Sequence, residues 1–126
     1  MEKPNIPEGY QQVMVYLIVK DAAGFIKFMQ DVFGAEEKMR QMRSENVIAH
    51  AEIKMGDSVI MVADAIDAFP PRNAGFFIYV ADADLVYNKA IAAGALAISP
   101  MADQPYGRSG GVTDLYGNSW WVTTAL

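Results

Sequence analysis

The single histidine of the chain, His50, stands two residues before Glu52 in a segment where polar and apolar residues alternate. Side chains at i and i+2 of a strand leave the same face, so an imidazole and a carboxylate meet there. Such a pair can move a proton or supply two metal ligands. Because zinc sites normally use three or four protein ligands, we interpret His50 first as a hydrogen-bonded surface residue. If it faces a binding cavity instead, His50 is the best candidate for a general base, with Glu52 as its partner.

Several other catalytic chemistries lack the residues they need. The chain has no cysteine, which excludes thiol nucleophiles, zinc ribbons and iron–sulfur clusters, and it has no second histidine for an acyl-transfer triad. The segment Gly107–Gly111 resembles a phosphate loop but lacks the Lys-Ser/Thr ending and the following helix. We interpret it as the entry to a bent strand. A remaining possibility is that Arg108, beside Tyr106, closes over an anionic group of a ligand.

Size and charge narrow the classes of partner. A chain of 126 residues with 52% hydrophobic side chains buries roughly two thirds of its unfolded surface, so we expect one domain over residues 1–126. The net charge of −5 and the absence of a basic cluster argue against nucleic acid. The apolar run Val13–Val19 is too short to span a membrane, and the first residues carry no apolar signal core. We expect a soluble, cytoplasmic protein.

The elements that position these residues come from an internal sequence repeat. Asp21 returns as Asp82, and Gly56 returns as Gly117, both 61 residues later. Each copy predicts a strand, a helix and three further strands. We therefore predict a first βαβββ module over residues 10–63 and a second over 75–124. The linker between them, residues 64–74, has two prolines and no periodicity.

Both predicted helices have an aspartate cap and one apolar stripe. In the first copy Asp21 caps a helix whose large apolar residues run from Phe25 to Phe33, and Gly34 ends it. In the second copy Asp82 and Gly94 take these places. The predicted strands are 13–19, 36–42, 47–55, 58–62, 76–80, 96–101, 110–113 and 119–124.

This order of elements and several phrases resemble the vicinal oxygen chelate superfamily, which includes glyoxalases, bleomycin-resistance proteins and dioxygenases. The phrases are Phe33-Gly34-Ala35-Glu36, Gly56-Asp57-Ser58-Val59-Ile60-Met61 and Tyr116-Gly117-Asn118-Ser119-Trp120-Trp121. The nearest branch is the glyoxalase-like group labelled after phosphonate metabolism. The resemblance implies an α+β fold in which tandem modules form an eight-stranded, cup-shaped sheet with helices outside and a ligand inside.

In metal-dependent members of that superfamily, four strand positions supply His, Glu or Gln to a divalent ion. Carried over by register, these positions are Met14, Met61, Gly75 and Trp121 here. A thioether, a glycine and an indole offer no oxygen ligand to a hard ion, and shifting each position by two residues adds no His, Asp or Glu. The resemblance therefore implies a cup without the metal of the superfamily, and we expect no cofactor.

The same register implies an apolar and aromatic cup wall. Trp120 and Trp121 point to opposite faces of one strand, so we expect Trp120 beneath a helix and Trp121 in the cup, although core packing remains open for Trp121. The candidate ligand-binding residues are Met14, Tyr16, Met61, Phe77, Tyr79, Tyr106, Arg108 and Trp121.

These observations leave three functions open. The leading hypothesis is a metal-free binding protein for an unidentified small molecule, a drug or a metabolite, acting as a homodimer with two cups. The second is an enzyme, either a metal-dependent lyase, isomerase or dioxygenase with ligands in another register, or a metal-independent catalyst using His50 and Glu52. The third is a regulatory or structural protein whose cup is filled core.

Overall fold

Each half of the chain forms a strand, a helix and three further strands in a computed structural model, which describes residues 2–126. The first half contains β1 (Val15–Val19), α1 (Ala22–Phe33), β2 (Glu36–Ser44), β3 (Val47–Met55) and β4 (Ser58–Asp64). The second half contains β5 (Gly75–Tyr79), α2 (Ala83–Ala92), β6 (Leu96–Gln104), β7 (Gly107–Thr113) and β8 (Ser119–Ala125). Within residues 2–126, neither helix has the length and apolar character that a membrane crossing requires. The predicted α+β fold of two βαβββ modules is confirmed.

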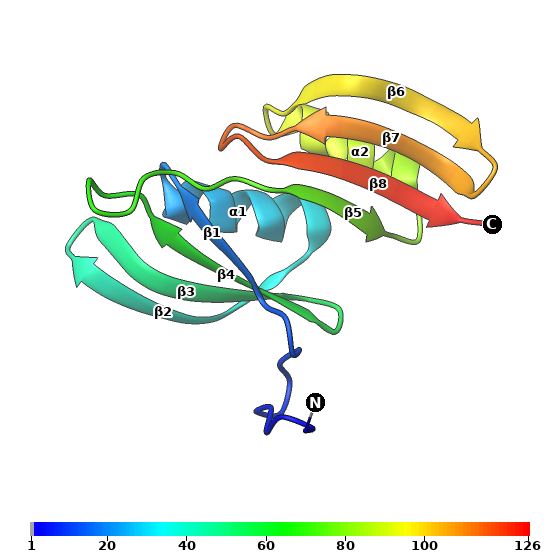
Figure 1. Cartoon of the computed structure of the whole chain (residues 1–126). Helices are drawn as coiled ribbons and strands as arrows, with labels where there is room; N and C mark the ends of the chain where they lie inside the picture. The colour runs from blue at the N-terminus through cyan, green and yellow to red at the C-terminus, as the bar shows by residue number, and fades with distance from the viewer. Residues whose placement is uncertain (1) are drawn as a thin grey trace.

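The eight strands are divided between two four-stranded sheets, with the orders β1-β4-β3-β2 and β5-β8-β7-β6 (Figure 1). The first and last strands of each module pair in parallel, and the remaining pairs are antiparallel. The strands of residues 2–126 thus form two open sheets, and β1 and β5 are edge strands. In Figure 1 the first sheet lies at the lower left and the second at the upper right. The N-terminal end of the chain points away from the first sheet.

The two helix starts support the internal repeat. The Asp21 carboxylate accepts a hydrogen bond from the backbone N–H of Gly24 at 3.0 Å, and Asp82 accepts one from Leu85 at 3.1 Å. Both caps satisfy a backbone donor that has no partner within its helix. The two caps and the two donors are each 61 residues apart, so the same capping hydrogen bond has formed twice, although Asp21 is left-handed and Asp82 is extended.

The core lies between α1 and the helix-facing sides of both sheets. Phe25, Met29 and Val32 of the predicted stripe are buried, and so is Trp120 of β8. The ring centroid of Trp120 lies 4.6 Å from that of Phe33 and 4.2 Å from that of Phe76. The predicted position of Trp120 beneath a helix is therefore confirmed, and α1 joins the two modules through it.

A bulge in β3 changes one predicted face. The pairing between β2 and β3 passes from Gln41–His50 to Met42–Ile48 and skips Ala49. Ile48 is consequently buried in the core, whereas Ala49 lines a cavity on the opposite side. Strict alternation along β3 would place Ala49 on the same face as Ala51, and it fails here because an extra residue enters the strand.

Candidate functional site

The face of the first sheet opposite α1 brings four of the predicted site residues together. Leu17 of β1 and Ala51 of β3 are buried against the helix, so the alternate residues face the other way. In the strand register, Met61 lies beside Tyr16 on one side and beside Glu52 on the other. The side chains that gather on this face are Tyr16, His50, Glu52 and Met61, and we call them the first-sheet cluster.

Hydrogen bonds fix the orientation of the imidazole. Nε2 of His50 lies 2.8 Å from Oε2 of Glu52, and Nδ1 lies 3.5 Å from the Tyr16 hydroxyl. A carboxylate only accepts, so Nε2 carries the proton in the neutral imidazole and Nδ1 keeps its lone pair. The rings of Tyr16 and His50 also stack with centroids 5.6 Å apart. The basic nitrogen is therefore the one that faces Tyr16.

Tyr10 completes this cluster, and sequence reasoning missed it. The Tyr10 hydroxyl donates a hydrogen bond to Oε1 of Glu52, which is 42 residues away. The Lys38 amine lies 4.3 Å from the centroid of the Tyr10 ring. The next residue, Gln11, anchors the segment by donating from Nε2 to the carbonyl of Asp57 at 2.6 Å. No local pattern could have shown that this irregular segment reaches β3.

Glu52 is a buried acid with both carboxylate oxygens engaged. The residue is 7% exposed, and burial of a carboxylate by itself disfavours its charged form. The hydrogen bonds from Tyr10 and His50 outweigh that cost and hold the pKa of Glu52 below its ordinary value. The same bond to Glu52 raises the pKa of the Tyr10 phenol. Glu52 is thus an anion held in place beside the imidazole.

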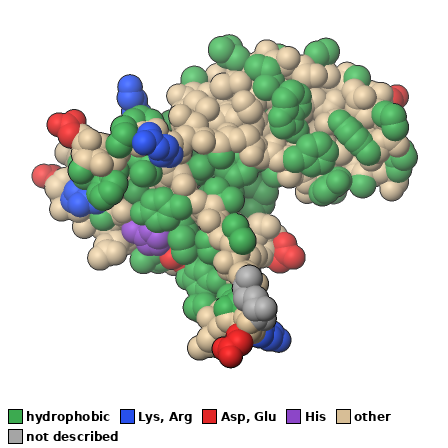
Figure 2. All heavy atoms as spheres, viewed as in Figure 1, with side chains coloured by type: hydrophobic (Ala, Val, Ile, Leu, Met, Phe, Trp, Pro, Cys, Tyr) green, Lys and Arg blue, Asp and Glu red, His purple; other side chains and the backbone are tan. Residues whose placement is uncertain are grey.

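The second sheet presents four aromatic side chains on the face away from the helices. Phe77 and Tyr79 on β5 pair in register with Trp121 and Thr123 on β8, and Tyr106 comes from the β6–β7 turn. The ring centroids of Phe77 and Tyr79 are 5.4 Å apart, and those of Phe77 and Tyr106 are 5.8 Å apart. Hydrophobic side chains gather over this sheet in Figure 2. We call Phe77, Tyr79, Tyr106 and Trp121 the aromatic face; their exposed fractions are 49%, 68%, 48% and 37%.

The glycine-rich segment is a strand that makes room for side chains. Gly111 of β7 pairs with Trp121, and a Cβ added at Gly111 would lie 2.5 Å from Cε3 of the indole. A Cβ at Gly110 would instead meet Met101. The segment predicted as a strand entry therefore belongs to β7 from Gly107 onward. The two glycines are needed because neighbouring side chains cover the strand.

Arg108 does not join the aromatic face. It pairs in register with Thr124, whose hydroxyl accepts a hydrogen bond from the backbone of α2, so Arg108 lies on the helix side of the sheet. Its guanidinium donates to Asp84 at 3.0 and 3.2 Å and to Asp103 at 3.2 Å. These bonds lower the pKa of Asp84, and they pair the positive charge of Arg108 with two carboxylates. We therefore leave Arg108 out of the candidate site.

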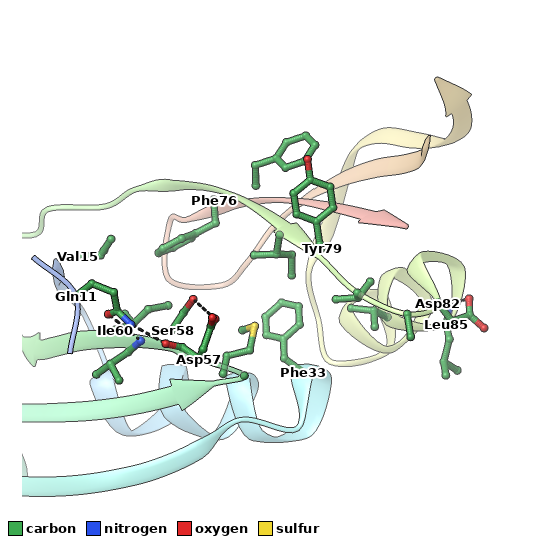
Figure 3. Close-up of a pocket in the computed structure, with 18 of the residues that line it drawn as sticks. Gln11, Val15, Phe33, Asp57, Ser58, Ile60, Phe76, Tyr79, Asp82 and Leu85 are labelled. Carbon is green, nitrogen blue, oxygen red and sulfur yellow. Dashed lines mark hydrogen bonds between the residues drawn. The ribbon is translucent and has the colours of Figure 1, made fainter. Parts of the chain in front are cut away.

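A groove of about 770 Å³ separates the two modules and adjoins the aromatic face (Figure 3). Phe77 and Tyr79 line it, together with residues of the N-terminal segment, the end of α1 and the β3–β4 turn. Figure 3 shows the contributions of the N-terminal segment, β1, α1, β5 and α2, among them Gln11, Val15, Phe33, Phe76, Tyr79 and Leu85. The groove and the aromatic face together form a mainly apolar space with one open side.

A smaller cavity of about 300 Å³ adjoins the first-sheet cluster through one of its members, Tyr16. Tyr16 is part of its wall, together with Ala49 of the bulge. Arg43 and Asp64 supply the charged groups of the wall, and Phe69 of the linker closes one side. The cavity thus reaches the side chain whose hydroxyl faces Nδ1 of His50.

The positions that correspond to metal ligands in the resembled superfamily do not fit a divalent ion. Met61 and Trp121 lie on the open faces of the two sheets. Met14 and Met61 carry thioether sulfurs, which cannot ionise to thiolates. The Met14 sulfur lies 3.3 Å from the backbone N–H of Gln11. Within residues 2–126, no three His, Cys, Asp or Glu side chains come together in a way that could hold a metal. Hard cations prefer oxygen donors, which these four positions lack.

Comparisons with known proteins match the chain to a family model and to solved structures of similar fold. The model of the "Glyoxalase/Bleomycin resistance protein/Dioxygenase superfamily" matches residues 10–122. Among solved structures, TioX from Micromonospora sp. ML1 is 27% identical with a TM-score of 0.75 and covers 92% of this chain and 99% of its own. TnmS3, an antibiotic binding protein from Streptomyces sp. CB03234, is 16% identical with a TM-score of 0.68, over 92% of this chain and 98% of its own. FosX, a fosfomycin resistance protein from Listeria monocytogenes, is 20% identical with a TM-score of 0.70, over 92% and 94%.

Proposed function

The chain belongs to the glyoxalase/bleomycin resistance protein/dioxygenase superfamily, and from this premise we propose that it binds a planar aromatic small molecule without a metal ion. The ligand lies on the aromatic face of the second sheet. TnmS3 and FosX are an antibiotic-binding and a resistance protein, and a drug or metabolite is the corresponding ligand class here. We also propose the finer placement in the branch labelled after phosphonate metabolism; the sequence phrases support it, as does the likeness in fold to a PhnB protein from Bacillus cereus.

The observation that carries this proposal is the exposure of four aromatic rings on one face. Large apolar side chains that gather on a surface mark a binding site more often than isolated ones do. A flat ligand can stack on Trp121 while Phe77 and Tyr106 contact its edges. The adjoining groove of about 770 Å³ is within the range of small-molecule sites. The net charge of −5 favours the approach of a cation.

Metal independence is part of the proposal and follows from the donor set. Met14, Met61, Gly75 and Trp121 occupy the four relevant positions, and none has a side-chain oxygen. The carboxylate of Glu52, which pairs in register with Met61, already accepts bonds from Tyr10 and His50. Binding of the ligand should therefore be the same with and without EDTA.

We also propose that the chain acts as a homodimer in which a second copy covers the open faces. The first-sheet cluster and the aromatic face lie on two separate sheets, and β1 and β5 are at sheet edges. An edge strand and an apolar face are both sites where another chain can pair. Sedimentation equilibrium should give twice the chain mass. A monomer at all concentrations would contradict this part of the proposal.

The binding proposal is tested with two dyes of opposite charge. Proflavine is a planar aromatic cation, and pyrene-1-sulfonate is a planar aromatic anion; both report binding by fluorescence polarisation. We expect proflavine to bind the wild-type protein more tightly. Replacing the indole in Trp121→Ala should weaken binding about tenfold, because a stacked aromatic pair contributes about 0.5–1.5 kcal/mol beyond burial.

The matched control is Phe69→Ala, which removes an exposed aromatic ring from the linker and not from the aromatic face. Its affinity for proflavine should equal that of the wild type. If neither dye binds, or if Trp121→Ala binds as tightly as Phe69→Ala, the aromatic face is not the ligand site.

A further inference from the structure

We infer that the small cavity beside the first sheet is a binding site for a small carboxylate with an aliphatic body, anchored by the guanidinium of Arg43. This site goes beyond the ligand proposed for the aromatic face, because it belongs to the other module and selects an anion. Three features carry the inference: two bulge residues that line the cavity, a cation in its wall without an ion pair, and an apolar enclosure held by backbone hydrogen bonds.

The first feature is the pair of bulges between β2 and β3. The strand register skips Ala49 of β3 and Arg43 of β2, so neither residue has a partner across the pair. Both residues line the cavity. A bulge bends its strand and re-aims a side chain, and bulges are frequent beside functional sites. The bulges therefore provide the space, next to the small side chain of Ala49, and the guanidinium at its edge.

The second feature is the balance of charge in the wall, which contains Arg43 and Asp64. The Asp64 carboxylate accepts a bond at 2.7 Å from the backbone N–H of Ala22 at the start of α1, and another at 2.7 Å from that of Ile48. Backbone donors at a helix start carry a partial positive charge that stabilises a carboxylate. Arg43 forms no ion pair within residues 2–126, so its charge is the one left for a ligand.

The third feature is the apolar enclosure. Tyr16 and Ile18 of β1 line the cavity on one side, and Phe69 of the linker closes another. Backbone hydrogen bonds fix the linker: Phe69 exchanges two bonds of 3.0 Å with Ile66, and Arg72 exchanges bonds of 3.1 and 2.8 Å with Ile18. The volume of about 300 Å³ is at the lower end of the range for small-molecule sites, so it suits a short ligand.

Together these features specify the chemistry of the ligand. A guanidinium presents parallel N–H donors that match the two oxygens of a carboxylate. The uncharged residues of the wall are mainly aliphatic or aromatic, so the body of the ligand is apolar. A short branched acid such as 3-methylbutanoate has both parts. It has no flat ring, so it cannot stack on Trp121 as the ligand of the aromatic face does.

The test compares three molecules with the same branched chain: 3-methylbutanoate, the neutral 3-methylbutanamide and the cation 3-methylbutylammonium. Each is titrated into the full chain at constant pH and ionic strength. The readout is the NMR signal of the His50 ring C–H groups, because His50 is the single histidine and its ring stacks on Tyr16 with centroids 5.6 Å apart. We expect the carboxylate to bind about tenfold more tightly than the amide, the lower end of what a hydrogen bond to a charged group contributes.

Substitutions in the wall separate the charge from the apolar body. Arg43→Gln should remove the preference for carboxylate over amide, and Arg43→Lys should keep only part of it, because an ammonium lacks the planar pair of donors. Phe69→Ala should weaken both ligands by a similar factor, since it removes apolar contact alone. The matched control is Arg40→Gln on the same strand. Arg40 pairs in register with Ala51, which is buried against the helix, so this variant should keep the preference.

The inference is overturned if 3-methylbutanoate gives no saturable change in the His50 signal, if it binds no more tightly than the amide, or if Arg43→Gln keeps the preference. Tightest binding by the ammonium would also overturn it and would make Asp64 the anchor. Proflavine binding to Arg43→Gln should equal that of the wild type, because the aromatic face lies on the other sheet. The failure of this site is therefore distinguishable from the failure of the proposed ligand site.

Discussion

Replacing Gly111 by alanine should damage the aromatic face without unfolding the protein. The new Cβ would lie 2.5 Å from Cε3 of Trp121, whereas carbon atoms in contact are about 3.5–4.0 Å apart. The indole must therefore move by about 1 Å or more. Since Trp121 is 37% exposed, it can turn outward rather than strain the core.

The free energy of unfolding should change little, because two contributions of opposite sign nearly cancel. Crowding a packed site costs about 1–3 kcal/mol, and an indole that can move outward takes the lower end of that range. Gly111 has no positive φ, so alanine fits its backbone and stabilises by about 0.4–1 kcal/mol through the unfolded chain. The free energy of unfolding should thus change by less than about 1 kcal/mol, as measured by urea titration.

Proflavine affinity should fall by up to about tenfold in Gly111→Ala, because the stacking contribution of the displaced indole is lost. The control is Gly110→Ala, in which the added Cβ meets Met101 and not Trp121. The reasoning is refuted if Gly111→Ala keeps the wild-type affinity and the wild-type tryptophan emission, or if Gly110→Ala loses the same affinity with an unchanged stability.

Three other outcomes follow from the contacts. Asp114→Ala should lower the free energy of unfolding by roughly 3–5 kcal/mol in urea, because it strands buried donors that include Nε1 of Trp120 at 2.8 Å, whereas exposed Asp103→Ala should have almost no effect. The pKa of Glu52 is lowered on folding, so its stabilisation is present above about pH 4.5 and is lost as the pH falls through the folded value. Urea titrations should therefore show a wild-type advantage over Glu52→Gln at pH 7 that shrinks below pH 4.5, and a constant difference would contradict the assigned cause. Arg108→Ala should leave proflavine affinity unchanged, because Arg108 pairs with Asp84 on the helix side, and a loss of affinity would return Arg108 to the ligand site.

Much of the fold was predictable because it depends on residues close together in the chain. A cap needs a side chain and a backbone donor three residues apart, and both Asp21 and Asp82 form the predicted bond. Strand alternation places Trp120 and Trp121 on opposite faces from their order alone, and the structure buries Trp120 while leaving Trp121 open. The pairing of His50 with Glu52 is of the same kind.

The candidate sites were predictable only in part because their geometry depends on distant segments. Tyr10 and Glu52 are 42 residues apart, and the segment before β1 gave no periodic signal that it folds onto β3. The sequence predicts a strand only from Gly110 onward, so the face on which Arg108 lies was decided by the length of β7 and its register with β8. The bulge at Ala49 likewise appears in the pairing with β2 and not in the local sequence.

The sequence by itself therefore determined two βαβββ modules, their caps and the alternation of side chains, since these follow from backbone geometry over a few residues. Only the tertiary structure decided that the strands divide into two sheets, that Tyr10 locks Glu52, and that Arg108 is paired away from the aromatic face. Contacts of this second kind form where chain segments meet in space, and many folds of the intervening chain are compatible with the same local pattern.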